Sequence, residues 1–392
     1  MRIGAQTSEQ LDYRPASLFV VERVRHTSAC PSCSRTADSA DEPTPTITTA
    51  PLPPQPIDRG LPGPGLLAHV VVSKFADHQP LYRQAGILAR HGVDVARSTL
   101  GGWVAAAADL LGPLVVRMAE LVRHSRVIQT DDTPVPVLDP GARRMRTGHL
   151  RVYLGDSDHP YAVFDFTPTY SGDGPRTWFG NYAGSVQAGA LKQYDPLFDR
   201  PPPRPAEVGC WAHTRRKFYD ARATDPGRAH EALSRIRRLY DIESEINPLD
   251  DTGRLAARRA RAGPLLEPLF EWLDRERDKV LPKSPMGVAI GYALGNRAAL
   301  CRYTDAGFLQ IDNNASERAL RAVAVGRKNY LFAGSDAGGR SAAVLYSIVG
   351  TCRRLGLDPF AYLRDTLARL PACRTGGGDG LLPVGRPGPL NG

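Results

Sequence analysis

Two patterns in the sequence predict a mixed α/β protein of two or three domains. Between Arg126 and His213 the apolar residues alternate with polar ones, as in strands, whereas the segments on either side repeat with a helical period. Successive strands that are followed by helices form a mixed α/β layer. A chain of 392 residues with 42% hydrophobic content can also bury more than one core. Small disulfide scaffolds and wholly disordered proteins are therefore excluded.

The expected elements follow from these periods. Five strands are bounded by Gly, Pro, Asp or Ser: Val127–Val137, His149–Leu154, Tyr161–Phe166, Ser185–Ala190 and Glu207–Trp211. Helices are expected over Gln79–His91, from Ser98 to about His124 with Ser98 as N-cap, over 215–280, and from Ile311 to about Leu370. The first two helices are joined by a short glycine-containing turn, which is typical of a helix-turn-helix that reads DNA and also of two helices that simply pack together.

The charge and the cysteines limit the environment. Lys and Arg number 50, of which six are lysine, against 41 Asp and Glu, so the net charge is +9. This excess suits a polyanionic partner, although a GC-rich genome produces the same arginine bias. Six widely spaced cysteines favour a reduced cytoplasm. No leader opens the chain, and no apolar stretch approaches the roughly 18 residues that span a bilayer, so we expect no membrane.

Three polar runs can carry chemistry. Asp131 and Asp132 lie in the first expected strand and point to opposite faces, unless the strand ends there in an Asp-Thr-Pro turn. In the second run, Asp312, Asn313 and Asn314 precede a helix with Glu317, Arg318 and Arg321, and the segment 326–329 is expected to form a turn that supplies Arg327 and Lys328. These groups together can hold a metal ion and a phosphate backbone, whereas each piece alone is typical of a solvated helix face.

The third run is CWAHTRRKF, residues 210–218. Cys210 and His213 have a spacing seen in metal sites, but two ligands do not complete a tetrahedral zinc site, so we do not expect zinc here. Arg215, Arg216 and Lys217 are better suited to contact phosphates at the start of a helix.

Together these runs resemble the insertion-sequence 66 family of bacterial DDE transposases, over roughly residues 7–371. The resemblance rests on the following segments: HQPLYRQAGILARHGV, STLGGWV, DDTPV, VGCWAHTRRKF, LPKSPMGVAIGYAL, DNNASERALR, GRKNYLFAGSDAGG and LGLDPFAYLRDTLARLP. It implies a ribonuclease H-like mixed sheet with flanking helices, a helical insertion and an N-terminal helical DNA-binding region.

The resemblance also implies a two-metal mechanism of DNA strand cleavage and transfer, with Mg²⁺ or Mn²⁺ held by three carboxylates. The family's first aspartate matches Asp131, its final glutamate matches Glu317, and Asp132 stands where a glutamate is usual. The second aspartate, on the fourth strand, is replaced by Gly189. Asp195 and Asp165 are the available stand-ins. We therefore expect a transposase whose cleavage is impaired, with a non-catalytic DNA-binding relic or accessory protein as the alternative.

The resemblance also predicts how the chain is divided. Relatives carry a zinc-binding N-terminal segment, of which this chain retains only the pair Cys30 and Cys33, with His26 as a candidate third ligand. We expect a partial site at most and no zinc cofactor. The expected segments are 1–41 (truncated zinc-finger-like), 42–65 (Pro-rich linker), 66–125 (helix-turn-helix-like), 126–335 (catalytic, with a helical insertion at about 215–300), 336–373 (C-terminal helices) and 374–392 (flexible tail).

The expected partners are transposon ends and target DNA, with a homo-oligomer assembled on the DNA. The DNA contacts are assigned to Arg215, Arg216, Lys217, Asn313, Asn314, Arg318, Arg321, Arg327 and Lys328. The expected location is the bacterial cytoplasm, associated with the nucleoid.

Overall fold

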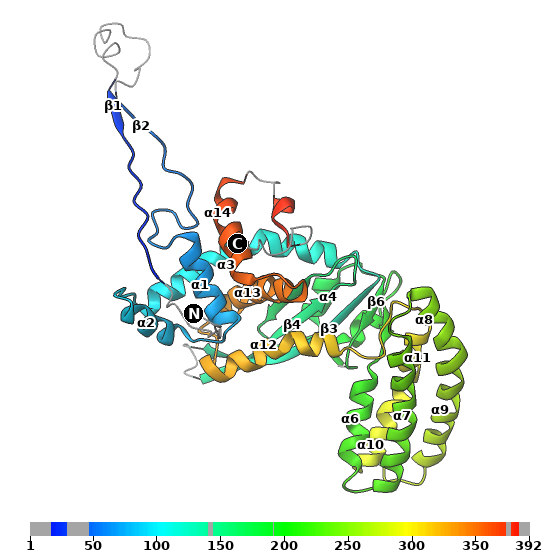
Figure 1. Cartoon of the computed structure of the whole chain (residues 1–392). Coiled ribbons are helices and arrows are strands. Elements are labelled where there is room, and N and C mark those ends of the chain that lie inside the picture. Colours follow the sequence, from blue (N-terminus) through cyan, green and yellow to red (C-terminus); the bar gives the residue numbers. More distant parts are fainter. Residues whose placement is uncertain (1–16, 30–46, 140–143, 191, 374–377, 384–392) are drawn as a thin grey trace, which may run out of the picture.

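A five-stranded mixed sheet lies at the centre of the molecule (Figure 1). The computed structural model describes residues 17–29, 47–139, 144–190, 192–373 and 378–383. The strands are β3 (Val127–Asp139), β4 (Arg144–Leu154), β5 (Ala162–Thr167), β6 (Ser185–Gln187) and β7 (Ala206–Val208), in the order β5-β4-β3-β6-β7. Pairs β3–β4 and β4–β5 are antiparallel, whereas β3–β6 and β6–β7 are parallel. The expected mixed α/β class and its five strands are confirmed.

Strand β3 continues through its two aspartates and two prolines, as the expected strand Val127–Val137 does, so the alternative of a turn at Asp-Thr-Pro is wrong. β6 pairs only with Val127–Gln129, and in the part of the chain that the structure describes no other strand along that edge needs an N–H from Pro134 or Pro136. Instead, the carbonyl of Pro136 accepts a hydrogen bond from the backbone N–H of Ala333. A free strand edge therefore tolerates the prolines that the turn interpretation relied on.

The register of the sheet separates the two aspartates. Asp131 lies opposite Val152, on the face where α12 (Asn314–Tyr330) and α13 (Asp336–Arg354) pack. Asp132 lies opposite Arg151, and the same face carries Tyr153 two positions along β4, stacked on Trp178 of α4 (Asp173–Phe179) at 3.7 Å between ring centroids. The prediction that the two carboxylates point to opposite faces is confirmed.

Helices from both ends of the chain form one layer beside the sheet. They are α1 (Pro64–Phe75), α2 (Leu81–Arg90), α3 (Arg97–Val122), α13 and α14 (Pro359–Arg369). The N-cap of α3 is Ala96 and not Ser98, which lies inside the helix. By length and composition α3 is apolar enough to cross a membrane. This contradicts our expectation that no apolar stretch is long enough to span a bilayer. Its residues Leu100, Leu111 and Met118 are fully buried in the core, so the apolar character of α3 serves packing here.

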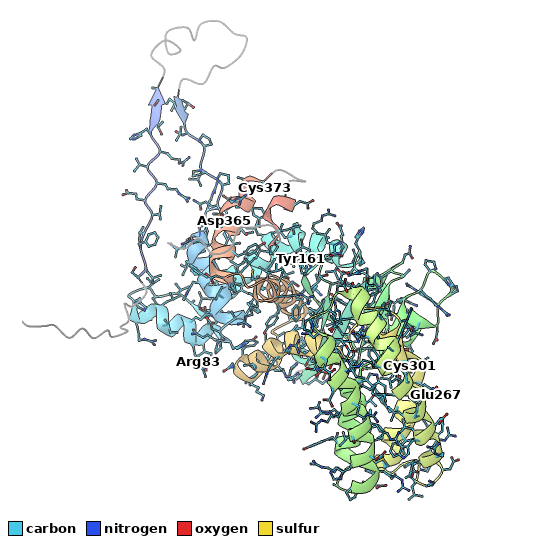
Figure 2. The ribbon with its side chains drawn as sticks, turned by 45° about the vertical axis from the view of Figure 1, so that its right-hand side comes forward. Arg83, Tyr161, Glu267, Cys301, Asp365 and Cys373 are labelled. Atoms are coloured by element: carbon cyan, nitrogen blue, oxygen red, sulfur yellow. The ribbon has the colours of Figure 1, made fainter. Side chains whose placement is uncertain are left out.

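A second lobe consists of helices inserted between β7 and α12 and has its own apolar core (Figure 1). Its elements are α6 (Trp211–Ala221), α7 (Pro226–Ile246), α8 (Asp251–Ala257), a π-helical turn at Arg258–Ala262, α9 (Gly263–Arg277), α10 (Pro285–Gly295) and α11 (Arg297–Cys301). Figure 2 shows Glu267 and Cys301 in this lobe, on the opposite side of the molecule from Arg83 and Asp365. Trp211 at the start of α6 is completely buried and donates its indole N–H to the carbonyl of Leu300.

Near the ends of the described chain, a strand pair projects from the body, and part of the tail that was expected to be flexible is folded. Strands β1 (Thr27–Ala29) and β2 (Ile47–Thr49) form an exposed antiparallel pair that projects from the body (Figure 1). Within the C-terminal segment expected to be flexible, Gly378–Leu381 forms a 3₁₀ helix. Leu381 and Leu382 are buried, and the Tyr362 hydroxyl donates to the Leu381 carbonyl. This part of the tail is therefore docked; residues 374–377 and 384–392 lie outside the described residues.

The helical lobe depends on a buried ion pair. Arg258 is fully buried, donates to both carboxylate oxygens of Glu243 at 2.7 and 2.8 Å, and also donates to the carbonyl of Ala306. We expect Arg258→Ala to lower the free energy of unfolding by about 3–5 kcal/mol, because it leaves a buried carboxylate without its partner. Arg259→Ala, at the exposed next position, should change it by less than about 0.5 kcal/mol. Urea unfolding followed by tryptophan fluorescence measures both; equal losses would contradict this account.

Candidate functional site

The site forms where the start of α12 meets β3. The side-chain amide of the fully buried Asn313 donates to the carbonyl of Thr130 at 3.2 Å, and also to the Ser316 hydroxyl at 3.2 Å. This contact holds the first turn of α12 against the residue that precedes Asp131. Glu317 lies in that first turn, on the same face of the sheet as Asp131. The structure therefore brings together the first and last carboxylates that the sequence predicted.

Asp131 is held in a setting that favours its protonated form. Its pKa is raised to about 7, mainly by burial and also by the nearby charges of Glu317 and Asp132, while a hydrogen bond from the backbone N–H of Asp132 opposes the shift. Such a carboxyl group is destabilising when charged, unless a cation shares the site. The electrostatics therefore suit a group that binds a metal ion.

Asp132 belongs to a separate network on the other face. Its carboxylate lies 2.6 Å from His149 Nδ1 and accepts a hydrogen bond from the Gln193 side chain at 2.8 Å. The Arg151 guanidinium donates to the oxygen of the same Gln193 side chain at 2.7 Å. This network fixes the segment that follows β6. It was not predictable from local patterns, because its members come from three separate elements.

Gly189 lies just beyond the end of β6, the strand that pairs with β3. A Cβ atom at this position would lie 2.7 Å from Cε1 and 2.9 Å from Nε2 of His213. The imidazole ring therefore fills the space that a side chain at 189 would enter. The Gly189 carbonyl accepts a hydrogen bond from the Tyr292 hydroxyl at 3.1 Å, which ties this segment to the helical lobe.

Neither proposed stand-in reaches this point. Asp165 pairs in register with Arg151, which pairs with Asp132, so Asp165 lies on the face opposite Asp131. Asp195 is exposed at the start of α5 (Asp195–Phe198), and its charge acts on Glu207 of β7, not on Asp131. Neither Asp165 nor Asp195 therefore supplies a carboxylate in place of the one missing at position 189.

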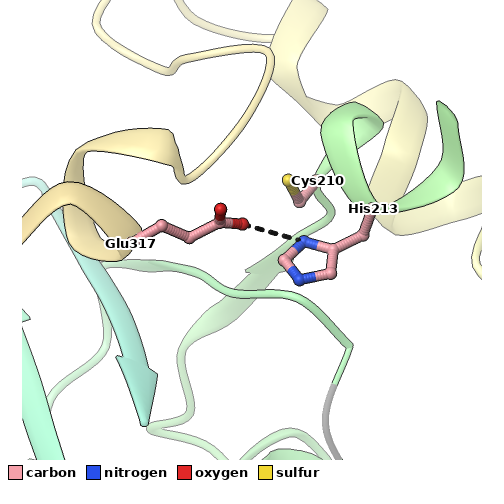
Figure 3. A group of neighbouring side chains, drawn as sticks. All are labelled: Cys210, His213 and Glu317. Atoms are coloured by element: carbon pink, nitrogen blue, oxygen red, sulfur yellow. Dashed lines mark ion pairs between the residues drawn. The ribbon is translucent and has the colours of Figure 1, made fainter. Parts of the chain in front are cut away.

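A cluster that the sequence left incomplete lies beside Glu317. One ligand atom from each of Cys210, His213 and Glu317 falls within 4.8 Å of the others, and His213 Nδ1 is 3.5 Å from Glu317 Oε1 (Figure 3). Burial lowers the pKa of His213, and the charge of Glu317 opposes the shift. The spacing of Cys210 and His213 was visible in the sequence, but their third partner lies more than 100 residues away along the chain.

The cationic residues expected to contact DNA fall into two groups. Arg215 and Arg216 are exposed on α6, where Lys217 lies over the Tyr292 ring. Arg318, Arg321 and Lys328 are exposed along α12. Residues 326–329 continue this helix and do not form the expected turn. Gly326 is suited to a close helix contact, because a Cβ there would meet the hydroxyl groups of Tyr330 and Tyr346.

Three other residues assigned to DNA are engaged within the fold. Asn313 is fully buried, so its assignment as a DNA contact is wrong in this conformation. Asn314 donates to the carboxylate of Asp312, and Arg327 donates to the Thr133 hydroxyl at 2.9 Å. These polar residues, which the sequence suggested as surface contacts, instead hold α12 against its neighbours.

The raised pKa of Asp131 predicts a pH-dependent stability. Between about pH 4 and 7 the folded chain retains a proton that the unfolded chain has lost, so this group makes the fold less stable as pH rises through that range. In metal-free buffer, we expect Asp131→Asn to raise the free energy of unfolding at pH 8 by about 1–3 kcal/mol, and by much less at pH 4.5. Asp109→Asn, at an exposed position of α3, is the control and should change neither value. Thermal melts at both pH values test this; an equal gain at both would contradict it.

Comparisons with known proteins agree with these features. The family model described as Transposase IS66 family matches residues 59–341, and the IS66 C-terminal element matches residues 347–383. The zinc-finger binding domain of transposase IS66 matches residues 1–34. That segment includes Cys30 and Cys33, which lie outside the described residues, and the match weighs against our expectation that zinc is not a cofactor.

Relatives match the chain over nearly its whole length. The Sinorhizobium fredii (strain NBRC 101917 / NGR234) protein called Uncharacterized protein y4jD is 34% identical over 381 residues, which are 94% of this chain and 72% of the relative. Uncharacterized protein y4qI of the same organism is 33% identical, over 94% of this chain and 68% of the relative. The chain therefore belongs to the IS66 family of transposases.

Proposed function

We propose that this chain is an insertion-sequence transposase whose DNA-cleaving site is built on Asp131 and Glu317 and is impaired by Gly189. One observation carries the proposal: α12 brings Glu317 close to Asp131, while Gly189, at the end of the neighbouring strand, supplies no side chain. The His213 ring occupies the space that such a side chain would enter. Membership of a transposase family implies DNA as the partner.

The strand order supports a ribonuclease H-like assignment for the sheet. In chain order, the first three strands form an antiparallel meander, and the last two run parallel to the first on its other side. The first carboxylate lies on the central strand and the last on a helix that follows an insertion of helices. We assign residues 126–335 to this catalytic unit, with the insertion at about 215–300, and 66–125 to a helical region that contacts DNA.

The donor set does not complete the pair of magnesium ions that the family suggests. Magnesium prefers carboxylate and water oxygens, and a two-metal site needs enough negative charge to hold both ions. Here Asp131 and Glu317 are the two family carboxylates that the fold brings together, and Glu317 also faces an imidazole. The nearby Asp312 carboxylate accepts hydrogen bonds from the Tyr240 hydroxyl and the Asn314 side chain. We therefore derive no reaction step through a metal pair and infer weak or absent strand cleavage.

The alternative is a DNA-binding protein that recognises transposon ends without cutting them. Gly189 favours this alternative as well, since the loss of one carboxylate leaves the basic surface untouched. Arg215 and Arg216 are exposed and form no ion pair among the described residues, so they are available to phosphates. On either reading we propose that the chain works on bacterial DNA in the cytoplasm, as a homo-oligomer on transposon ends and target.

Restoring the missing carboxylate tests the impairment. We expect Gly189→Asp to increase Mg²⁺-dependent strand cleavage and transfer at least about tenfold over the parent, because a bridging ligand supplies transition-state stabilisation on the order of a few kcal/mol. Gly189→Asn is the matched control, since it displaces the His213 ring equally but adds no charge. A strand-transfer assay on DNA that carries the element's ends measures all three. Robust, equal activity in the unmodified chain would refute the impairment.

DNA binding itself has a separate readout. If Arg215 and Arg216 contact phosphates, the double variant Arg215→Ala/Arg216→Ala should lower the slope of log affinity against log salt by about 2, almost independently of sequence. Arg275→Ala/Arg277→Ala is the control, because these exposed arginines of α9 already face Glu271 and Asp274. Fluorescence anisotropy over a range of salt concentrations gives the slope for each double variant. Identical slopes for the two variants would show that α6 does not contact DNA.

A further inference from the structure

The cluster at Cys210, His213 and Glu317 has the composition of a transition-metal site. It offers a thiol, an imidazole and a carboxylate from the starts of α6 and α12, all within 4.8 Å of one another (Figure 3). Zinc binds sulfur, nitrogen and oxygen ligands of this kind, whereas magnesium prefers oxygen alone. The donor chemistry therefore differs from that of a carboxylate pair for magnesium.

The surroundings of Cys210 match those of a metal-bound thiolate. Burial raises the pKa of its thiol to about 12, and the nearby backbone N–H groups of Asn313, His213 and Ala212 oppose this shift because they favour the thiolate. Without a cation the thiol keeps its proton; binding of a divalent metal would release that proton to solvent and place the negative charge among three N–H donors. Outer hydrogen bonds of this type orient metal ligands.

The imidazole is oriented toward the same point and lacks a hydrogen-bond partner. His213 Nδ1 is buried without one, and at 3.5 Å from Glu317 Oε1 it faces a carboxylate across a gap. Gly189 makes this orientation possible, since any side chain there would meet the ring. The residue that removes a carboxylate from one site thus gives room to a ligand of another.

The remaining adjustment is small. Ligand atoms of a tetrahedral zinc ion lie about 3.5 Å apart, so the widest separation of 4.8 Å must close by roughly 1 Å. The side chains of His213 and Glu317 are 29% and 39% exposed, which leaves both free to rotate and admits a water molecule as fourth ligand. Three protein ligands with one open position are typical of zinc sites that do more than stabilise a fold.

We propose that Cys210, His213 and Glu317 bind one zinc ion, with water in the fourth position. The inference shares Glu317 with the proposed DNA-cleaving site and does not require that site to work. Its test reads metal binding and not DNA cleavage, so failure of one proposal is distinguishable from failure of the other.

Cobalt serves as the spectroscopic probe. The full chain carries Cys30→Ser/Cys33→Ser, so that the N-terminal pair cannot contribute, and it is freed of metal by chelation. We expect one equivalent of Co²⁺ to produce a thiolate-to-cobalt charge-transfer band together with the intense visible bands of tetrahedral cobalt, and Zn²⁺ to displace both. Absence of these bands, or bands typical of six oxygen ligands, would overturn the proposal.

Variants assign the ligands. Cys210→Ser should abolish the charge-transfer band, and His213→Gln or Glu317→Gln should weaken Co²⁺ binding by at least about tenfold. Cys301→Ser, which alters a partly buried cysteine of the same lobe, is the matched control and should bind as the parent does. Circular dichroism verifies that each variant folds. Retention of the band in Cys210→Ser, or its loss in Cys301→Ser, would refute the assignment.

Discussion

The arrangement of the site depends on Asn313. Its side-chain amide reaches the carbonyl of Thr130 on the central strand, while its backbone N–H points at the sulfur of Cys210. One buried residue therefore connects β3, the first turn of α12 and the start of α6. A buried polar group is costly unless it is satisfied, and the amide nitrogen of Asn313 meets this requirement through Thr130 and Ser316, whereas its Oδ1 has no partner among the described residues. Glu317 is placed beside both Asp131 and His213 because Asn313 holds the three elements together.

Two kinds of metal site share this junction, one built from carboxylates and one that includes sulfur and nitrogen. Asp131 is a largely buried carboxyl group whose raised pKa disfavours its charged form unless a cation binds nearby. The neighbouring Glu317 instead lies with His213 and Cys210, whose nitrogen and sulfur are softer metal ligands. Gly189 favours the second kind of site, because it supplies no carboxylate and leaves space for the imidazole of His213. The basic residues of α6 and α12 remain exposed next to this junction. The function that we propose therefore combines an exposed basic surface for DNA with a centre impaired for cleaving it.

Local patterns predicted the fold well and the site only in part. The alternation of apolar residues located all five strands, and the resemblance to the transposase family, not the residue types alone, identified Asp131 and Glu317. The expected strand Val127–Val137 already ran through two prolines, but the choice between it and a turn at Asp-Thr-Pro depended on how short β6 is, which the sequence did not show. Likewise, Gly326 reads as a turn, but helix packing against Tyr346 keeps it helical. The contact of His213 with Glu317 and the burial of Asn313 arise from tertiary packing between distant segments, which no local pattern records.

We propose that the junction has lost a two-metal carboxylate site and holds a single thiolate-containing one. Anomalous diffraction from crystals of the full chain grown separately with Mn²⁺ and with Zn²⁺ tests it most directly. The account predicts one zinc peak bounded by Cys210, His213 and Glu317, and no pair of manganese peaks bridged by Asp131. Two manganese ions held between Asp131 and Glu317, with no zinc at Cys210, would contradict it.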